Sequence, residues 1–185
     1  MLEEGKYYHI YNRGNNSQPI FFENENYRYF LQLIKKYLEP VADIYSYCLI
    51  KNHYHLLIRV KPVNEINAEK LTYTTKDKPK KVSVTLQLSH LFNAYTQAIN
   101  KRFNRTGSLF EPKFHRIEID TDEYLIQSIL YIHNNPVKHN VCKQAKDYFW
   151  SSYNPILSNT NENNDFGHVL YLFGGRENFI IAHNE

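Results

Sequence analysis

Alternating and helical patterns of apolar residues divide most of the chain into strands and helices. Residues 7–13 read YYHIYNR, an aromatic, β-rich run that a Gly-Asn-Asn sequence at 14–16 ends. From residue 25 to residue 37, apolar residues recur at spacings of three and four, and Pro40 follows. The pattern therefore begins with a strand and an amphipathic helix.

The middle of the chain predicts two further strands and a long helix. Residues 42–50 and 53–61 are suited to strands, with a tight turn between them. The even-numbered positions from 54 to 60 are all apolar, so the side chains at 53 and 55 must point to the opposite face. A polar, lysine-rich segment at 62–80 predicts a flexible insertion loop, and residues 83–103 predict a helix.

The last part of the pattern supplies one more strand, at 113–119, and one more helix. Asp120 with Glu123 three residues later matches a capping box, and the helix is predicted to stop near Pro136. The order β-α-β-β-α-β-α predicts an α+β fold: a mostly antiparallel sheet with helices on one face, ferredoxin-like or RRM-like. We expect this domain to span residues 1–153, followed by a C-terminal appendage at 154–185.

Composition adds constraints on location and partners. The 185 residues carry a net charge of +3, but five acidic residues against one arginine from position 147 onward leave the earlier part with +7. This distribution is compatible with a polyanionic partner. Cys48 and Cys142 lack metal-type spacing and predict reduced thiols, with Cys48 in the core. Without a secretory signal or an apolar stretch of roughly 20 residues, we expect a cytoplasmic protein with no membrane contact.

His53 and His55 are candidate metal ligands. At i and i+2 on a strand they project from one face and can present two imidazole nitrogens to one metal ion. The spacing alone is a weak signal, since such pairs are common by chance. The apolar opposite face strengthens it, because core packing does not explain two histidines that point away from the core.

The last predicted helix carries a candidate nucleophile, Tyr131. Tyr124, Ser128, Tyr131 and Asn135 fall within an arc of about 60° on this helix. A phenol, with a pKa near 10, attacks a phosphate poorly unless a metal ion polarises that phosphate. Asn135 is the candidate third ligand, and two imidazoles with an amide oxygen suit Mg²⁺ or Mn²⁺. The competing interpretation is that Tyr131 is a boundary aromatic of the packed face.

Basic residues around a glycine-containing loop at 104–108 are candidate DNA contacts. Cations can hold the phosphate backbone while neighbouring aromatics stack on bases, although cations also favour helix C-termini. Lysines at 76, 78, 80 and 81 form a weaker second group, and Asn12 could also face a substrate unless it belongs to a structural turn. The predicted DNA-binding residues are Arg13, Lys101, Arg102, Arg105, Lys113 and Arg116.

Five short motifs in this order resemble the HUH-type single-tyrosine transposases, especially the REP-associated tyrosine transposase (RAYT-like) branch. They are YHIYNRG at 8–14, NHYHLLI at 52–58, GSLF at 107–110, YIHNNPV at 131–137 and WSSY at 150–153. The resemblance covers roughly residues 5–153.

The resemblance implies an activity and a mechanism. A transposase of this kind is an endonuclease that cleaves and rejoins single-stranded DNA beside small hairpins, in DNA transposition or related recombination. Tyr131 would form a covalent phosphotyrosine bond to the 5′-phosphate and free a 3′-hydroxyl, and His53 and His55 would be the histidines of the HUH motif. Simple members of the family commonly have Gln at the third-ligand position, so Asn135 departs from the pattern, and His133 is its rival.

The sequence leaves three hypotheses on the function of the chain. The first is the metal-dependent enzyme, which retains both histidines, the tyrosine and a ligand-type residue. The second is a domesticated, non-catalytic protein that binds single-stranded or hairpin DNA through the same fold. The third is a metal nuclease in which water attacks and Tyr131 only packs. The resemblance is compatible with a homodimer and with a monomer.

Overall fold

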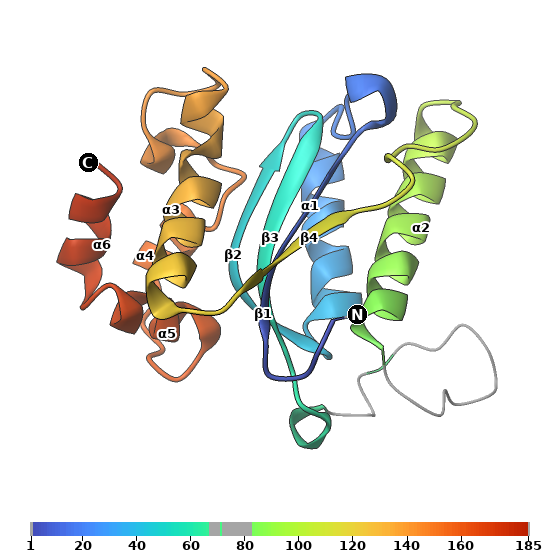
Figure 1. Cartoon of the computed structure of the whole chain (residues 1–185). Helices are drawn as coiled ribbons and strands as arrows, with labels where there is room; N and C mark the ends of the chain where they lie inside the picture. Colours follow the sequence, from blue (N-terminus) through green and yellow to red (C-terminus); the bar gives the residue numbers. More distant parts are fainter. Residues whose placement is uncertain (1, 67–70, 72–82, 185) are drawn as a thin grey trace.

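The computed structural model describes residues 2–66, 71 and 83–184 of the chain (Figure 1). Most of the predicted insertion loop at 62–80 lies outside these residues, and so do the lysines at 76, 78, 80 and 81. In the described first part of this loop, a short 3₁₀ turn forms at Val63–Glu65. None of the helices in the described segments combines the length and apolarity that a membrane crossing requires.

Four strands form one antiparallel sheet in the order β2-β3-β1-β4. They are β1 (Tyr7–Arg13), β2 (Ala42–Ile50), β3 (His53–Val60) and β4 (His115–Ile119). The two inner strands, β1 and β3, pair so that Arg13 lies opposite His53 and Tyr11 opposite His55, and on the other side of β1, Tyr11 lies opposite His115. This register gathers imidazole and phenol side chains at one end of the sheet.

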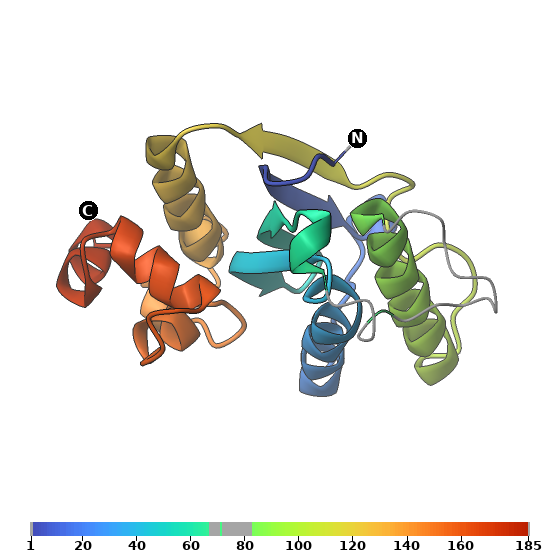
Figure 2. The same cartoon turned by 90° about the horizontal axis from the view of Figure 1, so that it is seen from below.

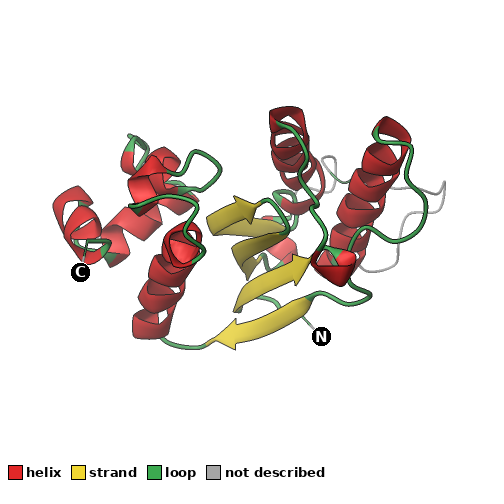
Figure 3. Ribbon diagram, turned by 90° about the horizontal axis from the view of Figure 1, so that it is seen from above, coloured by secondary structure: helices red, strands yellow, loops and turns green. Residues whose placement is uncertain are grey.

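Helices cover both faces of the sheet (Figures 2 and 3). On one face lie α1 (Asn24–Leu33), which continues as a π-helical turn over Ile34–Leu38, and α2 (Val84–Arg102). On the other lie α3 (Asp122–Lys138) and the C-terminal helices α4 (Tyr153–Leu157), α5 (Asp165–Leu172) and α6 (Arg176–Ala182). The predicted α+β class, element order and antiparallel sheet are confirmed, whereas the expectation of helices on one face needs correction.

The second helical face exists because the sheet is apolar on both sides. Tyr54 and Leu56 of β3 pack into the core beneath α1 and α2, as their alternation predicts. Leu57, on the same face as the two histidines, is also fully buried, in a second core with Cys48 of β2 and Ile129 of α3. Each face of the sheet therefore needs its own layer of helices to exclude water.

Helix α3 differs from its predicted bounds at both ends. Its N-cap is Thr121 rather than Asp120, and the Thr121 hydroxyl oxygen accepts a hydrogen bond from the Tyr124 amide at 3.1 Å. At the other end the helix continues through Pro136 to Lys138. Pro136 cannot donate to the carbonyl four residues earlier. It is buried, however, and the backbone amides of His139 and Val141 close the last turn by donating to the carbonyls of Asn135 and Pro136. Asn135 consequently stays helical, one turn after Tyr131.

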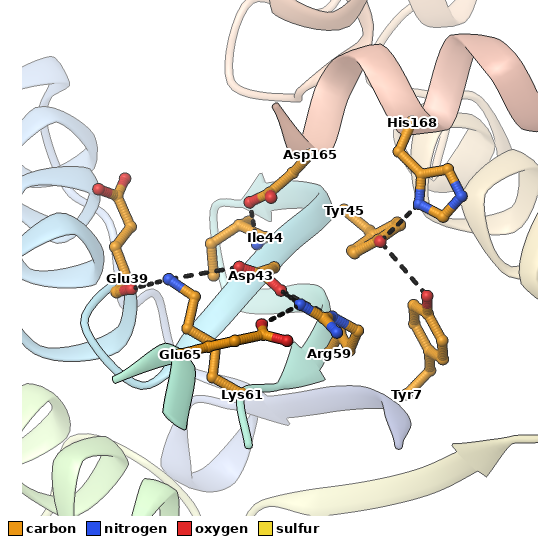
Figure 4. A network of polar contacts seen from close by, with 10 residues as sticks. All are labelled: Tyr7, Glu39, Asp43, Ile44, Tyr45, Arg59, Lys61, Glu65, Asp165 and His168. Atoms are coloured by element: carbon orange, nitrogen blue, oxygen red, sulfur yellow. Dashed lines mark hydrogen bonds and ion pairs between the residues drawn. The ribbon is translucent and has the colours of Figure 1, made fainter. Parts of the chain in front are cut away.

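A polar network attaches the C-terminal segment to the edge of the sheet (Figure 4). The Asp165 carboxylate accepts a hydrogen bond from the Ile44 amide of β2 at 2.8 Å, and the Tyr45 hydroxyl lies 2.7 Å from His168 Nδ1. Beside them, Arg59 of β3 forms an ion pair with Asp43 at 2.6 Å. Asp165 and His168 are thus hydrogen-bonded directly to β2. The division into a domain at 1–153 and an appendage at 154–185 stays a prediction.

Candidate functional site

The two histidines, the tyrosine and the asparagine singled out by the sequence meet at one end of the sheet, between β3 and α3. His53 Nε2 lies 2.8 Å from the Asn135 side-chain oxygen, which bridges strand and helix. The His53 and His55 rings are 5.3 Å apart, and the Tyr131 ring stands 5.7 Å from the His55 ring at an interplanar angle of 87°. The structure thus brings the four residues together from segments almost 80 residues apart.

Tyr131 lies at the surface of this cluster. Its side chain is 41% exposed, while Ile129 and Ile132 of the same helix are fully buried. The ammonium group of Lys138, two turns later, lies 4.3 Å from the centre of the Tyr131 ring. The tyrosine is therefore accessible from solvent beside the imidazoles rather than enclosed in the packed face.

The contacts of His53 fix its tautomer. Its Nδ1 lies 2.7 Å from the Asn52 side-chain oxygen, while the Asn52 amide nitrogen is directed at the Ser17 carbonyl at 3.4 Å. Since Asn52 in this orientation can only accept, Nδ1 carries the proton and Nε2 is a bare lone pair. Burial lowers the pKa of His53, which favours the neutral ring.

The His53–Asn135 contact then joins two acceptors. The bare Nε2 and the Asn135 oxygen are 2.8 Å apart without a proton to share. Either a flipped Asn135 amide or a cation held by both atoms relieves their repulsion. In the described part of the chain, no three His, Cys, Asp or Glu side chains lie close enough to hold a metal. Asn135 offers an amide oxygen beside His53 as a further candidate ligand. The donor set fits Mg²⁺ or Mn²⁺.

His55 is buried against a histidine that the sequence did not single out. His55 Nδ1 lies 2.8 Å from His9 Nε2 of β1. Burial, together with the nearby His9, lowers the pKa of His55 to about 2, and burial lowers the pKa of His9 to about 4. Both rings are therefore neutral at neutral pH, as metal coordination requires of an imidazole.

Two hollows adjoin at Tyr131. The larger, about 730 Å³, runs between α3 and the strands β1 and β4, and the smaller, about 410 Å³, surrounds His53 and Asn135. Tyr11, His55 and Tyr131 line both of them. An extended polymer could therefore lie in one hollow on each side of the tyrosine.

Of the predicted DNA-binding residues, the structure brings only Arg13 to these hollows. Arg13 lines the smaller one and forms an ion pair with Glu111 at 2.5 Å. Lys113 and Arg116 line a different hollow, beneath α2. Lys101 and Arg102 lie in the last turn of α2, and Arg105 follows in the loop after it. The C-terminal ends of α2 and β1 lie at the same end of the molecule (Figure 1). The role of all six in DNA binding stays a prediction.

Asn12 is a structural residue in the described structure. It is buried, and its amide donates to the Glu111 carbonyl at 3.1 Å while its oxygen accepts from the Arg13 amide at 2.8 Å. These hydrogen bonds favour a structural role for Asn12 over contact with a substrate. Both of its polar atoms are already used.

His133, the rival third ligand, points away from the site. It is fully buried, with Nδ1 2.8 Å from His183 Nε2 and its Nε2 2.8 Å from the Ser152 hydroxyl. His183 Nδ1 in turn lies 2.7 Å from the Phe179 carbonyl, which can only accept. The proton order follows: His183 donates to Phe179, His133 donates to His183, and Ser152 donates to His133. This series of hydrogen bonds connects α3 to the C-terminal end of α6.

Sequence reasoning missed several residues of the site: His9, Tyr11, Asn52, His115, Lys138 and His139. Strand alternation supplies a signal for two of them, because positions 9 and 11 share one face of β1. Helical spacing supplies another, because position 138 lies two turns after position 131. Those signals become informative only once β1 is known to pair with β3.

Comparisons with known proteins find one similar curated protein and a similar solved structure. No family model matches the chain. A protein of Haemophilus influenzae named a REP-associated tyrosine transposase is 26% identical over 106 residues; the match covers 57% of this chain and 56% of that protein, so the chain spans just over half the length of this curated relative.

Among solved structures, a REP-associated tyrosine transposase bound to a REP hairpin superposes with a TM-score of 0.65 at 16% identity, over 85% of this chain and 82% of that chain. This degree of likeness shows a shared fold. A bacterial tRNA(His) guanylyltransferase-like protein in complex with GTP gives a TM-score of only 0.38. The resemblance to REP-associated tyrosine transposases that the motifs indicate is thus confirmed in both sequence and fold.

Proposed function

We propose that this chain is a metal-dependent enzyme that cleaves and rejoins single-stranded DNA beside hairpins through a covalent bond to Tyr131. One observation carries the proposal. An exposed tyrosine stands 5.7 Å, ring to ring, from one of two neutral imidazoles, and the other imidazole lies 2.8 Å from the Asn135 amide oxygen. A protein that only binds DNA has no chemical need for this combination.

The proposed reaction is a transesterification. The Tyr131 hydroxyl loses its proton to solvent as its oxygen attacks the scissile phosphorus, and the bond from phosphorus to the 3′-oxygen breaks. The 3′-oxygen takes up a proton from solvent and leaves as a hydroxyl. The 5′-phosphate remains on Tyr131. Rejoining is the reverse: a 3′-hydroxyl attacks the phosphotyrosine and regenerates the phenol, so no external energy source is required.

His53, His55 and Asn135 would hold the divalent metal. When bound, such an ion polarises the scissile phosphate and offsets the charge that develops on its oxygens. The chain's own contribution is positional. β3 and α3 fix the two imidazoles and the amide around one point, and the exposed ring of Tyr131 lies beside that point. This arrangement would hold the Tyr131 hydroxyl near a phosphate bound at that point.

The hairpin specificity of the proposal comes from the solved relative, which is bound to a REP hairpin. In this chain, Arg13 in the smaller hollow and Lys138 beside Tyr131 would hold phosphates on either side of the attacked bond. The basic end of α2 is the further candidate for the hairpin stem. Arg102 there already pairs with Glu23 at 3.1 Å, so its contribution to DNA binding would require that ion pair to open.

Cleavage of labelled oligonucleotides tests the proposal. Single-stranded DNA with an imperfect hairpin, taken from the flanks of the chain's own gene, is incubated with Mn²⁺ and run on a denaturing gel. We expect a metal-dependent, protein-linked band and a free fragment with a 3′-hydroxyl. Tyr131→Phe should abolish both while leaving DNA binding intact.

Tyr171→Phe is the control, because Tyr171 lies on α5, outside the two hollows at Tyr131, and is 80% exposed. We expect it to keep the protein-linked band. Cleaved DNA without a protein-linked band would favour attack by water instead. Hairpin binding without cleavage across several metals would favour the non-catalytic DNA-binding protein.

A further inference from the structure

His9 and His55 form a buried histidine pair beside the proposed metal position. They lie on the neighbouring antiparallel strands β1 and β3, on the face that packs against α3, and both are 6% exposed. His9 Nε2 and His55 Nδ1 are 2.8 Å apart, a hydrogen-bond distance. The ring of His9 also lies 5.9 Å from that of Tyr131, so His9 contacts both a proposed ligand and the proposed nucleophile.

One proton lies between these two nitrogens, and its position decides what His55 can do. If His55 Nδ1 carries the proton and donates it to His9, then His55 Nε2 is a bare lone pair directed toward the hollow. If His9 donates instead, His55 carries its proton on Nε2 and that atom cannot bind a metal.

We propose that His9 is a positioning residue that accepts the Nδ1 proton of His55 and so presents His55 Nε2 to the metal. The inference rests on the proposed function, because it assigns His55 as a ligand. His53 offers an internal parallel, since the Asn52 oxygen accepts its Nδ1 proton at 2.7 Å and leaves Nε2 bare. With His9 in this role, both proposed histidine ligands have the same tautomer, each held by an acceptor behind the ring.

The tautomer can be observed directly in the metal-free protein without DNA. Long-range ¹⁵N–¹H correlation spectra of the imidazoles distinguish a protonated Nδ1 from a protonated Nε2. We expect His55 with its proton on Nδ1 and His9 with its proton on Nδ1, which leaves His9 Nε2 as the acceptor. A proton on His55 Nε2 in the wild-type protein would overturn the proposal.

Two substitutions separate hydrogen bonding from packing. His9→Phe keeps an aromatic ring against Tyr11 and Tyr131 but removes the acceptor. His9→Gln places an amide oxygen near the position of Nε2 and keeps it. Removing the hydrogen-bond partner of a metal-binding histidine typically lowers metal affinity about 10–100-fold. We expect that loss of Mn²⁺ affinity in His9→Phe and recovery of most of it in His9→Gln.

Mn²⁺ binding is measured without DNA, by the loss of the free-ion electron paramagnetic resonance signal, and circular dichroism confirms that each variant is folded. Equal Mn²⁺ affinity in His9→Phe and wild type would contradict the positioning role, as would a wild-type protein that binds no Mn²⁺. The proposed function fails separately: a wild-type protein that binds Mn²⁺ with the expected tautomers, yet never cleaves DNA, would refute the cleavage activity and leave the role of His9 standing.

Discussion

Acid should destabilise this protein well above the pH at which carboxylates titrate. Three buried imidazoles are held neutral: burial lowers the pKa of His9 to about 4, that of His55 to about 2 and that of His133 well below its usual value. In the unfolded chain each ring titrates near its ordinary pKa of about 6.5. Below that pH the unfolded state binds more protons than the folded state, so stability is lost as the pH falls.

The expected loss follows from proton linkage. A ring that titrates at about 6.5 when unfolded, and remains neutral when folded, costs about 1.2 kcal/mol between pH 7 and pH 5.5. Three such rings cost about 4 kcal/mol, a large part of the roughly 5–15 kcal/mol that stabilises a typical domain. Burial also lowers the pKa values of His53 and His183, which adds to the effect in the same direction.

Urea denaturation in EDTA at pH 7.0 and 5.5 measures this loss, with pH 8.0 as a reference at which stability should hardly differ from pH 7.0. His9→Gln is the matched variant, because it removes one titrating ring but keeps an acceptor for His55, and its loss should be smaller by about 1.2 kcal/mol. A wild-type loss below about 1 kcal/mol would refute the assignment of three neutral, buried imidazoles.

Further predictions concern single contacts. His183→Leu removes the acceptor of the fully buried His133 N–H and should lower the free energy of unfolding by about 1–3 kcal/mol in urea; an unchanged value would mean that the histidine chain does not bond α3 to α6. Within the described structure the buried Tyr54 hydroxyl has no hydrogen-bond partner, so Tyr54→Phe should leave stability unchanged or raise it by up to about 1 kcal/mol, and a clear loss would show that the hydroxyl is bonded. Asn135→Ala should weaken Mn²⁺ binding by at least about tenfold, and an unaltered Mn²⁺ titration would remove Asn135 from the ligand set.

The sequence predicted much of the site because its main signals are local. Alternation along β3 placed His53 and His55 on one face, and helical periodicity placed Tyr131 and Asn135 one turn apart. Neither inference needed the rest of the fold. The same local rules predicted the bounds of β1 correctly, and those of β2, β3 and α2 to within a residue.

What could not be predicted depends on pairing between distant segments. The His9–His55 contact requires the β1–β3 register, and the His133–His183 contact joins residues 50 apart along the chain. The second helical layer was missed because Leu57, the residue that reveals it, lies on the same strand face as the two histidines. The passage of α3 through Pro136 was missed because the local rule ends a helix before a proline, whereas Pro136 is buried by segments distant in the sequence and the amides of His139 and Val141 close the last turn.

The most direct test of the central claim is to locate the DNA on the protein. The wild-type chain is incubated with Mn²⁺ and a single-stranded hairpin oligonucleotide, denatured, digested with trypsin and nuclease, and sequenced by mass spectrometry. We predict a nucleotide joined through its 5′-phosphate to Tyr131, and to no other tyrosine. A nucleotide on a different residue, or cleaved DNA with no nucleotide on the protein, would contradict the assignment of Tyr131 as the nucleophile.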